Sequence, residues 1–161
     1  MIKITSTQWK NLDGLGDDAL QEMRPQAEHT VMKASLYLES TIKRKLTGAR
    51  SGRSYKVSRT GATHIASAPG EAPAVLFGNL RNSVGHSHPE WSGWTISQLV
   101  GPGLGTKPGG GVSDPGDAYA RRLEWGGADS RGVMIFPRPY IEPSVQEATS
   151  GMNAIFAEIG S

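Results

Sequence analysis

A run of apolar residues at helical spacing is the feature that most constrains how this chain folds. The run falls on one face of a helix at 3.6 residues per turn, and its members are Ala27, Val31, Ala34, Leu38, Ile42 and Leu46. Pro25 suits the first helical position, where its missing N–H has no intrahelical partner to lose. Gly48 ends the pattern. The sequence therefore predicts a long amphipathic helix over residues 25–46 with one side in a core.

Two further helices are predicted nearer the end of the chain. Residues 118–125 predict a short helix that is closed by Gly126. Pro143 is expected to open a closing helix. The apolar face of that helix has the members Val145, Ala148, Met152, Ile155, Phe156 and Ile159.

Strand patterns lie between the helices. Apolar alternation predicts strands over residues 80–84 and 94–100, joined as a hairpin or meander through a turn at 90–93. Residues 133–136 predict a short strand that ends at Pro137, because proline donates no hydrogen bond to a central ladder. We expect an α+β fold, with a small mixed or antiparallel sheet of three to four strands packed by the N-terminal and C-terminal helices.

Glycine and proline set the organisation of the rest. The chain has 161 residues with 21 Gly and 10 Pro, which favours one domain over residues 1–161 with long irregular segments. We expect an N-terminal arm over residues 1–24 and extended loops over 48–75 and 101–117, both long enough to contact a neighbouring subunit. No apolar stretch approaches the roughly 18 residues of a membrane span, so no membrane partner is expected.

The charge distribution is more informative than the net charge of +2. Seven Lys and Arg residues lie between Lys43 and Arg59, and no acid occurs from Ser40 through Gly70. Such a loop suits a partner protein or solvent, and this is the interpretation we favour. The alternative is a basic DNA-contacting protein that acts through this loop, in which the cations neutralise phosphates. Tyr55 is the only aromatic residue there that can stack on a base.

Catalytic signatures are weak throughout, so we expect no enzyme and no cofactor. The glycine-rich segment 101–111 is not a phosphate-binding loop, because Lys107 is followed by proline and more glycine instead of a helix. The absence of cysteine excludes disulfides and thiolate chemistry. A metal-dependent hydrolase built on His86, His88 and Glu90 is a distant alternative, since neither His29 nor His64, the other two histidines, has a characteristic spacing to the His86–His88 pair.

Three segments restricted by proline and glycine stand in order along the chain. The first is residues 66–74 (Ala-Ser-Ala-Pro-Gly-Glu-Ala-Pro-Ala) with 78–84 (Gly-Asn-Leu-Arg-Asn-Ser-Val). The second is 119–127 (Tyr-Ala-Arg-Arg-Leu-Glu-Trp-Gly-Gly), and the third is 137–145 (Pro-Arg-Pro-Tyr-Ile-Glu-Pro-Ser-Val). In this order, after an amphipathic helix, they resemble the neck and tail-completion proteins of lambda-like tailed bacteriophages. Phe77 departs from that pattern, which has a small or polar residue before the glycine.

The resemblance implies a structural virion protein that is made in the host cytoplasm. Such a subunit joins a homo-oligomeric ring at the neck or the head-proximal tail end and helps to connect the tail to the DNA-filled head. Its partners would be itself, a head-closure protein, a tail terminator or the tube, with non-specific contact to genomic DNA as a further option. We expect the interface to include Lys43, Arg44, Arg50, Arg53, Arg59, Arg121, Glu124, Trp125, Arg138 and Tyr140.

Overall fold

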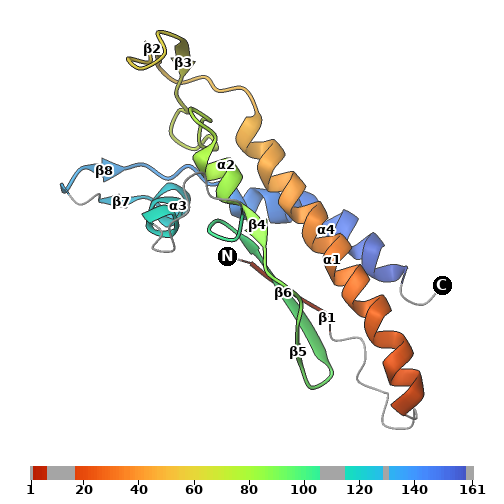
Figure 1. The fold of residues 1–161 in the computed structure, drawn as a ribbon. Coiled ribbons are helices and arrows are strands. Elements are labelled where there is room, and N and C mark those ends of the chain that lie inside the picture. The colour runs from red at the N-terminus through yellow and green to blue at the C-terminus, as the bar shows by residue number, and fades with distance from the viewer. Residues whose placement is uncertain (1, 7–16, 106–114, 129–130, 159–161) are drawn as a thin grey trace.

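Two helices and a small antiparallel sheet form the body of the molecule. The structure is a computed structural model that describes residues 2–6, 17–105, 115–128 and 131–158. Figure 1 shows the long helix α1 (Asp17–Thr47) running beside the sheet and crossing the closing helix α4 (Ile141–Ala157). The expected α+β class is confirmed.

Helix α1 buries the face that its apolar spacing predicts. All six predicted members, from Ala27 to Leu46, are at most 1% exposed. The predicted start is wrong, because the helix begins at Asp17 and Pro25 lies inside it. Acidic residues are favoured in the first turn of a helix because of the helix dipole, and the sequence has Asp17 and Asp18 at the start of α1. The first turn thus forms upstream, and the helix continues through the proline although one backbone hydrogen bond is missing.

Strand β6 (Thr95–Gly101) is the centre of the four-stranded sheet. On one edge it pairs antiparallel with β1 (Ile2–Ser6), and Ile2 lies opposite Val100. On the other edge it pairs with β4 (Gly85–His86) and β5 (Glu90–Ser92), both antiparallel. Alternate residues of β6 are buried beneath α1, as expected for a strand with one face in the core; they are Ile96, Gln98 and Val100.

The segment predicted as a strand over residues 80–84 is instead a short helix, α2 (Asn79–Ser83). Gly78 adopts a left-handed conformation with φ of 79° before it and accepts a hydrogen bond from the Asn82 N–H at 2.8 Å. Apolar alternation over five residues does not distinguish a strand from a single helical turn. The predicted turn at 90–93 is also wrong, because β5 lies there and Gly93, with φ of 60°, makes the tight connection to β6.

The last third of the chain follows the prediction with shifted boundaries. Helix α3 (Pro115–Trp125) begins before residue 118, and Gly126 ends it in a left-handed conformation, as expected. The predicted strand at 133–136 is β8 (Met134–Ile135), which pairs with β7 (Gly127–Ala128). Helix α4 begins two residues before Pro143, and Ala148 and Ile155 of its predicted face are buried. Ile159 lies outside the described residues.

The predicted arms are only partly irregular. Loop 48–75 contains an antiparallel pair, β2 (Ser54–Lys56) and β3 (Thr63–Ile65). In the predicted N-terminal arm, the residues at either end belong to β1 and α1, and 7–16 lie outside the described residues. Most of loop 101–117 also lies outside them, from 106 to 114. None of the described helices is both long and apolar enough to cross a membrane.

Candidate interface: two projecting hairpins and an apolar groove

Two hairpins extend away from the helical body in Figure 1. One is made by β7 and β8, between α3 and α4. The other, which we call the ribbon, comprises residues 52–66 and contains β2 and β3. Projecting segments are stabilised little by packing against the core. The contacts at the base of each hairpin and its exposed side chains are therefore the observations that bear on its function.

A buried carboxylate closes the base of the β7–β8 hairpin. Glu124 lies at the end of α3 and is 6% exposed. Its Oε2 accepts the backbone N–H of Tyr140 at 2.9 Å and that of Ile141 at 3.0 Å, and its Oε1 accepts that of Glu142 at 3.0 Å. These donors have no intrahelical partner at a helix start, so one side chain caps α4 from a different helix. The chain before the hairpin is therefore fixed to the chain after it.

The β7–β8 region exposes a concentration of large apolar side chains. We call it the apolar face, and its exposed fractions are 70% for Trp125, 55% for Val133, 68% for Met134 and 63% for Phe136. Isolated exposed apolar residues are ordinary, but several on one projecting hairpin are typical of a protein contact. Tryptophan and methionine are also enriched at interfaces.

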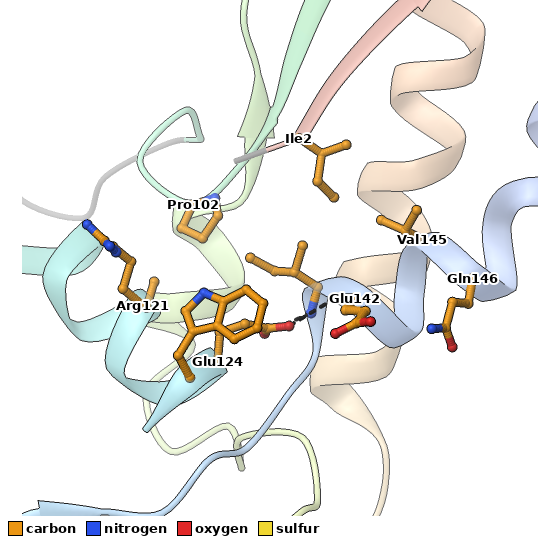
Figure 2. Close-up of a pocket in the computed structure, with 10 residues that line it drawn as sticks. Ile2, Pro102, Arg121, Glu124, Glu142, Val145 and Gln146 are labelled. Atoms are coloured by element: carbon orange, nitrogen blue, oxygen red, sulfur yellow. Dashed lines mark hydrogen bonds between the residues drawn. The ribbon is translucent and has the colours of Figure 1, made fainter. Parts of the chain in front are cut away.

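An apolar groove of about 650 Å³ adjoins this face. Figure 2 shows its lining, which comes from β1, the turn after β6, α3 and the first turns of α4. The lining residues are Ile2, Pro102, Ala120, Arg121, Glu124, Trp125, Ile141, Glu142, Val145 and Gln146. The Glu124 cap lies at the groove wall, so the contact that anchors the hairpin also shapes the groove.

The ribbon is closed by a different carboxylate. Glu71 follows the ribbon and accepts hydrogen bonds from the Ser51 hydroxyl at 2.5 Å and the Ala68 N–H at 2.9 Å. These bonds, the Ser51 hydroxyl first, hold the pKa of Glu71 at about 2. Glu71 is only half-buried, whereas Glu124 is buried. The carboxylate is thus ionised over almost the whole pH range, in a site that water reaches.

Several cations predicted at an interface are engaged inside the molecule. Lys43 pairs with Glu39 on α1, and Arg44 pairs with Glu147 on α4. Arg50 donates to the carbonyls at the end of α1, Lys45 and Leu46, and to the carbonyl of Pro73. A guanidinium with five donors suits this role, because the last carbonyls of a helix lack partners. Arg50 therefore caps α1 and ties the loop to it, and its predicted contact with a partner stays a prediction.

Two other predicted interface residues are buried. Tyr140 is fully buried in the core with Leu38, Val84 and Leu123, and its carbonyl accepts the Ser144 hydroxyl at 2.5 Å. Glu124 is the cap described above. Tyr140 has no exposed surface, whereas Glu124 reaches the wall of the groove, so the two residues hold the joint in place and their predicted contact with a partner stays a prediction. The prolines and the capping glutamate of these motifs form a joint between α3 and α4, and Glu124 and Tyr140 are buried because they lie in this joint.

The remaining predicted residues lie at the surface. Arg53, Arg59, Arg121 and Trp125 are exposed. Arg138 is half-buried, and its N–H donates to the Leu123 carbonyl at 2.6 Å, which ties the hairpin to α3 a second time. Sequence reasoning missed Val133, Met134 and Phe136, which it treated only as a strand. The available signal was an apolar run too short for a core strand, between glycine and proline.

The candidate metal residues do not converge. His86 Nδ1 lies 2.6 Å from Glu39 Oε2. Although burial raises the pKa of Glu39, its hydrogen bonds with Lys43 and His86 hold that pKa below its usual value. No group of three potential ligands is placed to hold a metal ion within the described part of the chain.

Comparison with family models, with characterised proteins and with solved structures finds no match to this chain.

Proposed function

We propose that this chain is a structural virion subunit of a tailed phage, and that it forms a ring at the neck or the head-proximal end of the tail. The observation that carries the proposal is the apolar face on a projecting hairpin that is rigidly tied to the core. Exposure of such an apolar surface to water is unfavourable, and burial of the surface against another protein lowers the free energy. The three motif segments, which resemble those of neck and tail-completion proteins, support the phage context.

The motifs have a clear mechanical role that fits such a subunit. The segment 119–127 supplies Glu124 as a cap and Trp125 as an exposed anchor, on adjacent residues. The segment 137–145 supplies the backbone that Glu124 binds. Together they set the orientation of the hairpin relative to the groove. Fixed orientation favours assembly, because a preorganised contact loses less entropy on binding.

The hairpin and the groove also suit repeated contact between copies. We place the side chains of Val133, Met134 and Phe136 of one hairpin against the groove of the next copy, whose lining includes Trp125. Such a head-to-tail contact uses different surfaces on the two partners, and it generates a ring when the rotation closes. Each copy then keeps its helical body for the adjacent neck or tail protein, which would be a head-closure protein, a tail terminator or the tube.

The experiment is complementation of a nonsense mutant of this gene in its phage with plasmid-borne variants. The test variant carries Trp125→Ser, Met134→Ser and Phe136→Ser. The control carries Leu36→Ser and Trp94→Ser, which remove two exposed apolar side chains, one from α1 and one from the turn before β6. Both variants are first shown to unfold at the wild-type urea midpoint.

We expect the control to restore infectious particles to within a few-fold of wild type. The test variant should lower their yield by at least about 100-fold, because removal of anchors at the centre of an interface costs several kcal/mol. Equal yields from the two variants would contradict a contact through the apolar face. Failure of the wild-type gene product to appear in purified particles would contradict the virion assignment itself.

A further inference from the structure

The basic stretch from Lys43 to Arg59 is uniform in sequence but divided in space. Its first three cations pair with acids on the helical body: Lys43 with Glu39, and Arg44 and Lys45 with Glu147. The fourth, Arg50, caps α1. The last three lie on the ribbon, and they are Arg53, Lys56 and Arg59. All three are exposed, and none forms an ion pair with an acid in the described part of the chain.

The ribbon holds these cations on an ordered scaffold. Its strands pair through Tyr55 and His64, whose rings meet edge to face at 5.3 Å. The Val57 N–H donates to the Ala62 carbonyl at 2.9 Å, and this bond closes the far end of the ribbon. At the base, the Gly52 N–H donates to the Ala66 carbonyl at 3.0 Å. The charges therefore sit on a preformed two-stranded structure instead of a loose tail.

The surroundings leave these charges unneutralised. No acid occurs in the sequence from Ser40 through Gly70, so neither strand carries a negative charge. The nearest acid after the ribbon, Glu71, is occupied by Ser51 and Ala68. Arg59 lies over the ring of Phe77, 5.8 Å from its centroid, which orients the guanidinium and leaves its N–H donors available. A cluster of this kind attracts polyanions.

We propose that the ribbon is a binding site for the phosphate backbone of duplex DNA. A two-stranded β-ribbon fits the major groove of B-DNA. Arg53 directly precedes β2 and Lys56 ends it, roughly 10 Å further along the chain, and duplex DNA presents one charge per about 1.7 Å of axis. Several phosphates therefore lie within reach of the ribbon. The contact is independent of the proposed ring, because it uses a different hairpin.

An acidic protein surface is the competing ligand for three cations. We favour DNA because the cations are distributed along the ribbon, from Arg53 near its base through Lys56 in β2 to Arg59 at its far end, as a linear polyanion requires. The contact reads no sequence, since charge is its main component and phosphates are the same at every position. Binding should therefore depend steeply on salt and little on base composition.

The test measures fluorescence anisotropy of a labelled 25-base-pair duplex with the full chain, at salt concentrations from 20 to 100 mM. The test variant carries Arg53→Gln, Lys56→Gln and Arg59→Gln. The control carries Lys33→Gln, Lys43→Gln and Arg44→Gln, which remove the same charge from ion pairs on α1. Glutamine removes the charge but stays polar, with a helix propensity close to those of lysine and arginine. Unlabelled poly-glutamate and a duplex of different sequence are the competitors.

For wild type and control, a plot of the logarithm of the affinity against the logarithm of the salt concentration should have a slope of about −2.7. This value follows because the three cations neutralise three phosphates, and each contributes about −0.9. The test variant should bind at least about tenfold more weakly at 20 mM salt, with a slope near zero. Equal weakening in both variants would show a general effect of net charge and would overturn the proposal. So would absence of wild-type binding, or competition by poly-glutamate at the same charge concentration as DNA.

Discussion

The two projecting hairpins are built alike and differ in what holds them. Each is closed at its base by one glutamate that joins the chain before the hairpin to the chain after it. Glu124 precedes the β7–β8 hairpin and binds the backbone of Tyr140, Ile141 and Glu142. Glu71 follows the ribbon and binds Ser51 and Ala68. The first glutamate is buried beside the core and the second is half-exposed.

Because of that difference, the β7–β8 hairpin is an integral part of the fold, whereas the ribbon is attached to the fold at the surface. The β7–β8 hairpin depends on a bond network that also starts α4, so its orientation and the stability of the body are coupled. The ribbon depends on bonds at the surface, so it can change without loss of the core. A contact that must keep a fixed geometry suits the first hairpin, and a contact with a uniform polyanion suits the second.

The largest effect is expected from Glu124→Ala. The substitution leaves three backbone N–H groups at the start of α4 without their acceptor. We expect a loss of about 2–4 kcal/mol in the free energy of unfolding, measured by urea denaturation. The buried Tyr140 N–H without an acceptor costs about 1–3 kcal/mol, and the two part-buried donors cost less because water reaches them. Glu124→Gln keeps one acceptor oxygen and should lose less. A loss below about 1 kcal/mol in the alanine variant would contradict the role of this cap.

A matched pair of glycines compares the two hairpins next. Gly126 and Gly61 both have positive φ, of 75° and 67°. An added Cβ at Gly126 meets the Ile135 carbonyl oxygen and Pro137 at 3.0 Å, whereas nothing lies within 4 Å of one at Gly61. We expect Gly61→Ala to cost about 1 kcal/mol, from backbone strain alone, and Gly126→Ala about 2 kcal/mol or more. Equal thermal unfolding midpoints would show that the base of the β7–β8 hairpin is no tighter than the ribbon tip.

A smaller and local effect is expected from Glu71→Gln. The variant loses the carboxylate that joins Ser51 to Ala68, but it keeps the core. We expect the urea midpoint to stay close to wild type and tryptic cleavage after Lys56 and Arg59 to accelerate several-fold. Cleavage after Arg131 serves as the internal control and should be unchanged. A large drop in the urea midpoint would mean that the ribbon is coupled to the core after all.

The smallest effect concerns acid pH. Glu71 has a usual pKa of 4.5, and its hydrogen bonds lower the pKa to about 2 in the folded chain. A lowered carboxyl pKa stabilises the folded ribbon above the unfolded pKa, and this contribution fades as the pH falls through the folded one. The amide NMR signals of Ser51 and Ala68 should therefore stay constant down to about pH 4 and change towards pH 2. A midpoint near 4.5 would show that the carboxylate bonds are absent in solution.

Sequence reasoning succeeded where a pattern repeats over many residues. Six apolar positions on α1 predict one buried face, and all six are buried, because each turn repeats the same requirement. It failed for segments of two to five residues. Residues 79–83 form a helix instead of a strand, since Gly78 and its contacts, not periodicity, decide the local geometry.

The candidate site was only partly predictable, because its chemistry depends on contacts between distant residues. Arg50 looks like its neighbours in sequence, yet one of its acceptors is the carbonyl of Pro73. The predicted interface residues Glu124 and Tyr140 meet 16 residues apart and are buried together. Exposure of Met134 and Phe136 likewise follows from the hairpin that carries them. Composition identifies a basic stretch; only the fold separates its paired cations from those on the ribbon.

The most direct test of the proposed structural role is a nonsense mutation in this gene, in the phage or prophage that the proposal implies, with the induced lysate viewed by negative-stain electron microscopy. We expect filled heads beside detached or malformed tails, and tailed particles again when the wild-type gene is supplied from a plasmid. Normal, infectious particles from the mutant would contradict a role in virion assembly.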